Sequence, residues 1–309
     1  MKVLVTGGAG FIGSHVADAL ISEGHDIIVI DNLYTGFKKN ANPKAKFYNA
    51  DICDEEKIAK IFGNEKPDAV NHHAAQMDVR RSTREPVFDA KVNILGSLVI
   101  LQNCIKNNVK KFVYGNSAGA SYGEPKYLPM DEEHPVNAIC EYGISKHTVE
   151  HYLYLYNYNY GLDYVSLRYP NVYGTRQEPE NEAGVVSIFV SLMLQGKRPV
   201  IFGDGTQMRD FVFVSDVVKA NLLALKKLTN KCYNLGSGKG ITVNQVYSTI
   251  KKKLNSSLEP IYADERVGEI SKCYFSYDKI RKDFGWKPEI SFEQGVEILI
   301  DYWKKRIKR

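Results

Sequence analysis

A glycine-rich segment between a strand and a helix most strongly restricts the fold of this 309-residue chain. The segment, T-G-G-A-G-F-I-G-S at 6–14, follows a β-branched run at 2–6 and precedes apolar residues at helical spacing. In such a loop Gly7 permits a tight turn, Gly10 lets backbone approach a pyrophosphate, and Gly13 lets the helix pack on the strand. The segment predicts a dinucleotide site, with phosphates at the positive N-terminal end of the helix.

Polar and small residues after the next strands extend this prediction. Asp31 ends the second predicted strand, where a carboxylate accepts hydrogen bonds from both adenosine ribose hydroxyls and repels a 2′-phosphate, so NAD is favoured over NADP. Asp51 and Ile52 follow the third strand, near the expected adenine edge, although Asp51 also suits an ordinary turn. The candidate cofactor-binding residues are Gly7, Gly10, Phe11, Ile12, Gly13, Asp31, Asn32, Asp51, Ile52, Ala74, Ala75, Gln76 and Asn93.

Strand and helix signals alternate through the first half of the chain, which indicates a parallel sheet with crossover helices on both faces. The expected fold is α/β: a Rossmann-type doubly wound sheet over 1–168, with returning segments around 200–240. Beyond about residue 170 the pattern loosens, which predicts a smaller, mixed α/β substrate lobe over 169–309, interleaved with the first. Strands fit 2–6, 26–30, 47–49, 69–71, 112–114 and 164–168, and helices fit 13–23, 54–62, 85–107 and 142–160.

Composition argues against several other classes of protein. Hydrophobic residues make up 44% and charged residues 25%, so an ordered globular chain is expected, and no run of about 18 apolar residues predicts a membrane span. Scattered cysteines and the lack of a signal-peptide pattern predict a reduced, cytoplasmic protein. His72 and His73 have no suitably spaced partners, so no metal site is expected. The net charge of +5 comes from the basic tail at 304–309, and no nucleic-acid partner is expected.

Tyr142 and Lys146 lie four residues apart in a predicted helix, so their side chains share one face. The ordinary pKa of tyrosine is about 10, but a nearby ammonium and the positive nicotinamide of NAD⁺ would both favour the phenolate. Tyr142 is therefore a candidate general base, and Lys146 a candidate contact of the nicotinamide ribose; both join the cofactor-binding candidates. Ser117, after a predicted strand, would supply a hydroxyl to the reacting oxygen, with Ser121 as the competing candidate.

Together these motifs resemble the extended short-chain dehydrogenase/reductase family, in its nucleotide-sugar epimerase branch, and are most similar to UDP-glucose 4-epimerases. The resemblance covers nearly the whole chain, and it implies catalytic roles for Ser117, Tyr142 and Lys146. It is carried by T-G-G-A-G-F-I-G-S-H at 6–15, D-N-L at 31–33, H-x-A-A-Q at 72–76, Y-G-x-S-K at 142–146, L-R-Y-x-N-V-Y-G at 167–174, F-G-D-G at 202–205, R-D at 209–210 and G-W-x-P at 285–288.

The resemblance implies NAD-dependent epimerisation of a UDP-hexose at C4 through a transient 4-keto sugar. Tyr142 would take the proton of the 4-hydroxyl while hydride passes to NAD⁺ and later returns to the other face of the sugar. It also implies that the guanidinium groups of Arg209 and Arg266 grip the diphosphate, and that Glu269 accepts from the uridine ribose. The candidate substrate-binding residues are Val79, Ser117, Asn171, Arg209, Arg266, Glu269 and Cys273.

The residues after the catalytic serine separate this activity from related ones. Dehydratases of the family carry an Asp-Glu pair there and decarboxylases a Glu, whereas this chain has Ala118, Gly119 and Ala120. The alternatives are another enzyme of the superfamily (a dehydratase, a reductase, or a uronate 4-epimerase whose substrate carboxylate meets Arg80 and Arg81) and a catalytically impaired NAD-binding relative.

Several positions depart from the family pattern. Gly115 and Asn116 stand where serines are usual, and Glu141 where proline usually precedes the tyrosine. His73 replaces an apolar residue and Phe213 a tyrosine. Glu141 would place a negative charge beside Tyr142 and raise its pKa.

Cys273 aligns with the position that limits room for the 2-substituent of the sugar. A small residue there predicts activity on both UDP-glucose/UDP-galactose and the N-acetyl pair, although Cys273 is equally compatible with simple packing. The family also implies a homodimer through the helices at 85–107 and 142–160. The second of these helices carries tyrosines that cannot share one face, which indicates either packing on several sides or a subunit interface: Tyr152, Tyr154, Tyr156, Tyr158 and Tyr160.

Overall fold

The computed structural model describes residues 1–179, 184–265 and 270–307. The chain forms two compact units, each assembled from separate segments. The sequence predicted that residues 1–168 belong to the first unit. In the structure, residues 124–134 instead cluster with the second unit. The first unit contains Met1–Gly123, Pro135–Tyr169 and Val218–Tyr233, and the second contains Glu124–His134, Pro170–Val217 and Asn234–Arg309.

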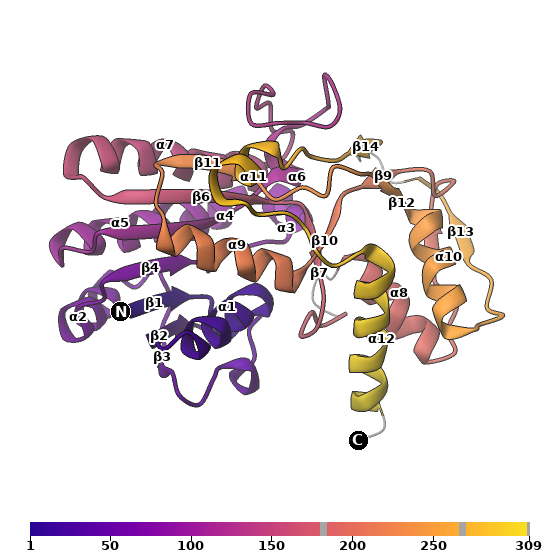
Figure 1. The fold of residues 1–309 in the computed structure, drawn as a ribbon, viewed down its shortest axis with the longest axis horizontal. Coiled ribbons are helices and arrows are strands. Elements are labelled where there is room, and N and C mark those ends of the chain that lie inside the picture. Colours follow the sequence, from indigo (N-terminus) through magenta and orange to yellow (C-terminus); the bar gives the residue numbers. More distant parts are fainter. Residues whose placement is uncertain (180–183, 266–269, 308–309) are drawn as a thin grey trace. The chain divides into compact units, whose positions relative to one another are not determined.

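Seven strands form the central sheet of the first unit (Figure 1): β1 Lys2–Thr6, β2 Asp26–Asp31, β3 Lys46–Asn49, β4 Ala69–His72, β5 Lys111–Ser117, β6 Asp163–Tyr169 and β11 Lys231–Asn234. Their order is β11-β6-β5-β4-β1-β2-β3. β1 pairs in parallel with β2 and β4, so Thr6 lies opposite Ile30 on one side and His72 on the other. The order therefore reverses between β1 and β4, and in doubly wound sheets a ligand binds at this reversal, beyond the carboxyl ends of the strands.

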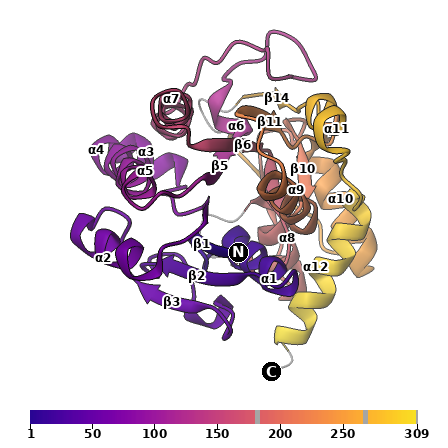
Figure 2. The same ribbon diagram turned by 60° about the vertical axis from the view of Figure 1, so that its left-hand side comes forward.

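Helices cover both faces of this sheet: α1 Phe11–Ser22, α2 Glu55–Glu65, α3 Val79–Arg84, α4 Pro86–Ala90, α5 Gly96–Lys106, α6 Ala118–Ser121 and α7 Glu141–Tyr160. α2, α5 and α7 share one face, and α1 lies on the other (Figure 2). On the face with three helices, a continuous core buries Ile30, Phe62, Leu101, Phe112 and Leu153. Burying a side chain of this size stabilises the fold by about 1.5–3 kcal/mol. The doubly wound sheet confirms the expected fold class.

The long helix predicted at 85–107 is interrupted in the structure. α4 gives way to a π-helical turn at Lys91–Leu95 before α5 begins. The turn contains Asn93, whose side chain is almost fully buried. π-Helical turns inside α-helices are frequent at functional sites, so the surroundings of Asn93 bear on the site described below.

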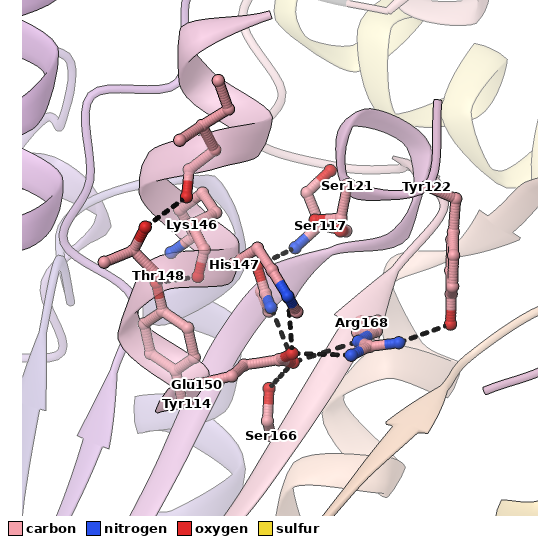
Figure 3. Close-up of polar contacts among 12 residues, drawn as sticks. Tyr114, Ser117, Ser121, Tyr122, Lys146, His147, Thr148, Glu150, Ser166 and Arg168 are labelled. Atoms are coloured by element: carbon pink, nitrogen blue, oxygen red, sulfur yellow. Dashed lines mark hydrogen bonds and ion pairs between the residues drawn. The ribbon is translucent and has the colours of Figure 1, made fainter. Parts of the chain in front are cut away.

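A buried ion pair joins α7 to β6 (Figure 3). The carboxylate of Glu150 lies 2.6 Å from the guanidinium of Arg168, and both side chains are about 95% buried, with 6% and 5% of their surface exposed. Ser166 and Asn116 each donate to the same carboxylate at 2.7 Å. Burial alone would raise the pKa of Glu150, but bonds from His147 and Arg168 hold it well below its usual range. Since each charge has several partners, this pair anchors the helix to the sheet.

The second unit is a smaller mixed α/β body with three short sheets. In these, β7 Asn171–Tyr173 pairs with β10 Phe211–Phe213, β8 Val200–Phe202 with β13 Ile261–Ala263, and β9 Met208–Arg209 with both β12 Ile241–Thr242 and β14 Lys272–Cys273. Its helices are α8 Val185–Leu194, α10 Val243–Leu254, α11 Asp278–Phe284, α12 Phe292–Ile307 and the first part of α9 Val214–Lys226. The rings of Tyr173, Phe211, Phe213 and Phe292 form an aromatic core. Across the described part of the chain, no helix is long and apolar enough to cross a membrane.

Candidate active site

The loop between β1 and α1 requires its glycines. Gly7 adopts a left-handed backbone (φ +66°), and a Cβ there would lie 2.8 Å from the backbone nitrogen of Ala74. A Cβ on Gly13 would lie 2.3 Å from the carbonyl oxygen of Gly7, so only glycine lets α1 approach β1 this closely. Gly10 provides no capping side chain, which leaves the first N–H groups of α1 with partial positive charge for an anion.

Carboxylates at the ends of β2 and β3 lie beside this loop. Asp31 is 7% exposed and accepts hydrogen bonds from the N–H groups of Leu33 (2.8 Å) and Ala9 (2.9 Å). Burial raises the pKa of Asp31, and these bonds oppose that shift. Asn32 donates to Asp51 at 2.9 Å, which links the two strand ends. The other candidates at this edge are Phe11 and Ile12, which open α1 and are partly exposed, and Ile52, which is buried.

Hydrogen bonds hold the turn after β4, where Ala74 and Ala75 are partly exposed. The hydroxyl of Thr6 accepts from the N–H of Ala74 at 3.0 Å. The N–H of Gln76 donates to Oδ1 of Asn93 (2.8 Å), and Nδ2 of Asn93 donates to the carbonyl oxygen of Gln76 (3.0 Å). Asn93 therefore ties this turn to the π-helical turn, and its direct contact with a cofactor stays a prediction.

Tyr142 and Ser117 meet where α7 begins. Tyr142 lies in the first turn of α7, and Ser117, the last residue of β5, forms a hydrogen bond with it. A Cβ on Gly143 would lie 2.0 Å from the carbonyl oxygen of Ala120, so glycine lets α7 pack directly on α6. Lys146 follows one turn later and is 3% exposed. The structure thus brings the three predicted catalytic residues into one part of the first unit.

Ser121, the competing candidate, has a different role. It is fully buried, and its hydroxyl donates to the carbonyl oxygen of Ser117 at 2.6 Å (Figure 3). Oγ of Ser117 accepts from the N–H of Ala120 (3.3 Å), which caps α6. The geometry therefore favours Ser117 as the hydroxyl beside Tyr142.

The second unit carries the other substrate candidates on short strands. Asn171 opens β7, and Arg209 lies directly opposite Cys273 in the pairing of β9 with β14. Cys273 is 4% exposed, and burial raises the pKa of its thiol to about 12. Arg266 and Glu269 lie outside the described residues.

A pocket of about 260 Å³ lies beside these strands in the second unit. Phe202, Gly203 and Asp204 of the F-G-D-G motif line it together with Gln207 and Lys272. The motif contributes to the family resemblance, but its residues do not indicate a pocket by themselves. The sequence signal that could have indicated the pocket is the position of Gln207, two residues before the candidate Arg209, and of Lys272, directly before the candidate Cys273.

Comparison with known proteins decides the family. The profile of the NAD dependent epimerase/dehydratase family matches residues 3–236. The chain belongs to this family. A putative UDP-glucose 4-epimerase of Methanocaldococcus jannaschii is 48% identical over 98% of both chains. Among solved structures, the Thermotoga maritima UDP-glucose 4-epimerase with UDP-glucose has 47% identity and a TM-score of 0.98, covering 99% of this chain and 100% of that one. The Thermus thermophilus enzyme in complex with NAD has 39% identity and a TM-score of 0.94, covering 98% and 99%.

The sheet edge of this epimerase/dehydratase family member fits NAD. Side-chain-free backbone at Gly7 and Gly13 leaves the N-terminus of α1 open to a diphosphate. A carboxylate has about four acceptor sites, so Asp31 keeps capacity for ribose hydroxyls beside its backbone bonds. Val79, one of the substrate-binding candidates, opens α3 and is 41% exposed. Among the described residues no cluster of His, Cys, Asp and Glu is placed to hold a metal ion.

Burial changes the acid–base properties of the catalytic residues. It raises the pKa of Tyr142, the charge of Asp89 raises it further, and the hydrogen bond from Ser117 lowers it. Burial lowers the pKa of Lys146 to about 7, while Glu150 and Asp89 act in the opposite direction. The spacing predicts that Lys146 lowers the pKa of Tyr142. In the protein itself, loss of hydration is the largest influence, and the pKa of Tyr142 lies above its ordinary value.

The sequence predicted that the carboxylate of Glu141 raises the pKa of Tyr142, but in the structure a different carboxylate has this effect. The hydroxyl of Thr83 on α3 donates to the carboxylate of Glu141 at 2.9 Å. The carboxylate that acts on Tyr142 is that of Asp89 on α4. Sequence patterns do not indicate Asp89, because an isolated aspartate in a short helix is usually a surface residue.

Gly115 and His73, two of the departures from the family pattern, lie next to each other in the structure. A Cβ on Gly115 would lie 3.0 Å from the ring of Tyr169 and 3.1 Å from the imidazole of His73. Nε2 of His73 is 3.0 Å from the hydroxyl of Tyr169, and burial lowers the pKa of His73 to about 3. His72 lies 2.7 Å from the hydroxyl of Thr6. These contacts support structural roles for both histidines, and the missing side chain at 115 makes room for one of them.

Asp31→Asn tests the cofactor assignment at the end of β2. We expect the ratio of NAD affinity to NADP affinity to fall about tenfold, about 1.4 kcal/mol, because a 2′-phosphate no longer meets a carboxylate. Calorimetric titration with each dinucleotide measures the ratio. Asp26→Asn, at the exposed start of the same strand, is the matched control; a ratio that stays the same in both variants would refute the assignment.

Proposed function

We propose that the chain catalyses the reversible, NAD-dependent epimerisation of a UDP-hexose at C4. The observation that carries this proposal is the assembled set of Ser117, Tyr142 and Lys146, followed by side chains without acid–base groups at 118–120. Elimination of water or loss of carboxylate would need a further acid or base at the sugar. The UDP-glucose in the Thermotoga maritima structure, at 47% identity, supports the same substrate class.

Proton transfer is the contribution of Tyr142 to this reaction. The phenol takes the proton of the 4-hydroxyl and returns it later, and the hydroxyl of Ser117 holds the reacting oxygen near the phenol. Lys146, one turn further along α7, supplies positive charge on the same helical face. When bound, NAD⁺ accepts hydride from C4 and gives it back to the other face of the 4-keto sugar. No net oxidation results.

Binding of the UDP group is assigned to the second unit. Guanidinium forks suit a diphosphate, which supports Arg209 and Arg266 as its partners, with the amide of Asn171 beside them. Glu269 would accept from the uridine ribose. The pocket next to β9 and β14 offers further hydrogen-bonding groups for the nucleoside, such as the side chains of Asp204 and Gln207.

Incubation with UDP-galactose, followed by detection of UDP-glucose, tests the function. We expect conversion by the protein with its bound NAD, and a loss of about 10²–10⁴-fold in kcat for Tyr142→Phe, because the general base is removed. Tyr158→Phe, on the exposed part of the same helix, should leave kcat unchanged.

Other outcomes of this assay support other members of the superfamily. A 4-keto-6-deoxy sugar would indicate a dehydratase, and turnover of UDP-glucuronate alone would indicate a uronate epimerase. No turnover of any UDP-sugar would indicate an impaired NAD-binding relative and would overturn the proposal.

The substrate range follows from the residue opposite Arg209. Cys273 is small, so we propose that the 2-N-acetyl group is accommodated and that UDP-GlcNAc is also epimerised. Cys273→Tyr should abolish activity on UDP-GlcNAc and keep that on UDP-galactose, because the ring fills the space of the acetamido group. Product analysis with both substrates measures this. A wild-type protein active on UDP-glucose and inactive on UDP-GlcNAc would exclude the wider range.

We also propose a homodimer, formed by the outer face of α4, the π-helical turn, α5 and α7. These elements pack on one another, and apolar side chains on them are exposed: Val87 by 81%, Leu95 by 56% and Ile144 by 55%. Tyr154 and Tyr158 stack on the same helix and are also exposed. Contiguous exposed apolar side chains are typical of subunit interfaces.

Leu95→Glu tests the interface. We expect the molar mass in solution to fall from a dimer to the 34.9 kDa monomer, because a charge cannot be buried there without a partner. Light scattering coupled to size exclusion measures the mass. Ile298→Glu, an exposed isoleucine on α12, is the control; a wild-type monomer would contradict the proposal.

A cytoplasmic location is proposed as well. No disulfide joins the five cysteines, all of which lie within the described residues. Free thiols persist in reducing compartments. Fractionation of cells that express the protein would test it.

A further inference from the structure

Asp89 is a buried carboxylate that the mechanism above does not use. It lies on α4 and is 1% exposed. Its Oδ1 accepts hydrogen bonds from Nε2 of Gln76 and Nδ2 of Asn93, both at 3.0 Å. Within 1–179, 184–265 and 270–307 it forms no ion pair, in contrast to Glu150, which is paired with Arg168. A charge buried with only amide donors is costly and acts strongly on its surroundings.

The neighbours of Asp89 are the catalytic residues. α4 packs against α7, and the charge of Asp89 acts on Tyr142 and Cys140 where that helix begins and on Lys146 one turn later. It also acts on Tyr114 of β5, the ring over which the ammonium of Lys146 lies at 4.1 Å. One buried carboxylate therefore influences both Tyr142 and Lys146.

We infer that Asp89 is a positioning residue that makes proton removal by Tyr142 depend on the positive charge of NAD⁺. The inference rests on the proposed function. Through Oδ1, Asp89 fixes Gln76 and Asn93, which are both cofactor candidates. Its charge adds to the effect of burial in raising the pKa of Tyr142, and it opposes the lowering of the Lys146 pKa by burial. Beside this carboxylate, the phenol of Tyr142 ionises only when a positive charge is close to it. Tyr142 therefore acts as a base when the oxidised cofactor is bound and otherwise retains its proton.

The sign of the effect follows from the groups around Tyr142. Asp89 acts on it from α4, Tyr114 interacts with it from β5, and Cys140 acts on it from the residue that caps α7. Removing Asp89 lowers the pKa of Tyr142 directly. It also weakens the ammonium of Lys146, which acts in the opposite direction. The direct effect decides the sign, because Asp89 has the largest influence of any charged group on Tyr142.

Asp89→Asn tests the inference with little change of shape, since the amide oxygen can still accept from Gln76 and Asn93. The ionisation of Tyr142 in the NAD⁺-bound protein is followed by the ultraviolet absorbance of phenolate, with Tyr142→Phe subtracted. We expect the titration to move to lower pH by roughly one unit. The acid limb of the pH–kcat profile with UDP-galactose should move by the same amount. Glu85→Gln removes an exposed carboxylate just before α4 and should move neither, because water and the guanidinium of Arg81 at 2.9 Å screen it.

The spectroscopic titration needs no UDP-sugar, so it decides the inference even if the proposed function fails. Titrations of Asp89→Asn and wild type that coincide, or a shift to higher pH, would overturn it. Asp89→Ser, which also removes the charge, provides a second variant if the first does not fold. NAD content and melting temperature, measured on each variant, separate a change in protonation from a loss of structure.

Discussion

Close approach of backbone at two glycines is the constraint on which the site of the first unit depends. A Cβ on Gly13 would lie 2.3 Å from the carbonyl oxygen of Gly7, and one on Gly143 would lie 2.0 Å from that of Ala120. The first contact brings the start of α1 to the end of β1, where partial positive charge suits a diphosphate. The second brings Tyr142 into hydrogen-bonding contact with Ser117. In both places a helix start packs on backbone, and any side chain would force the two apart.

Once α7 is held in this way, the charges beneath it determine what its residues can do. Glu150 pairs with Arg168 and anchors the helix, and its carboxylate also opposes the lowering of the Lys146 pKa by burial. Asp89 lacks such a partner among the described residues, and burial still lowers the pKa of Lys146 to about 7. Loss of hydration therefore outweighs both carboxylates at the lysine. One added positive charge therefore changes the pKa values of Tyr142 and Lys146 strongly, because little solvent is present to screen that charge.

The parts of the site that sequence could predict depend on spacing within one strand, turn or helix. The glycine loop, Asp31 and the pair Tyr142–Lys146 are of this kind, and the fold followed from the alternation of strand and helix signals. Asp89 could not be predicted, because its burial arises from the packing of α4 on α7. The π-helical turn around Asn93 was equally hidden, since the apolar pattern through it is that of a continuous helix.

Departures from a family pattern can be judged only in three dimensions. Considered separately, the change to Gly115 removes a hydroxyl and the change to His73 introduces a polar ring beside the sheet edge. Each change alone suggests an impaired active site. In the structure the imidazole of His73 lies where a side chain at 115 would intrude, and it bonds the hydroxyl of Tyr169 on β6. The three residues lie on or directly after neighbouring strands and are distant in sequence, so neither change predicts the other from a single chain. Each change accommodates the other, and Ser117 still bonds Tyr142 in the same structure, so together they do not indicate lost catalysis.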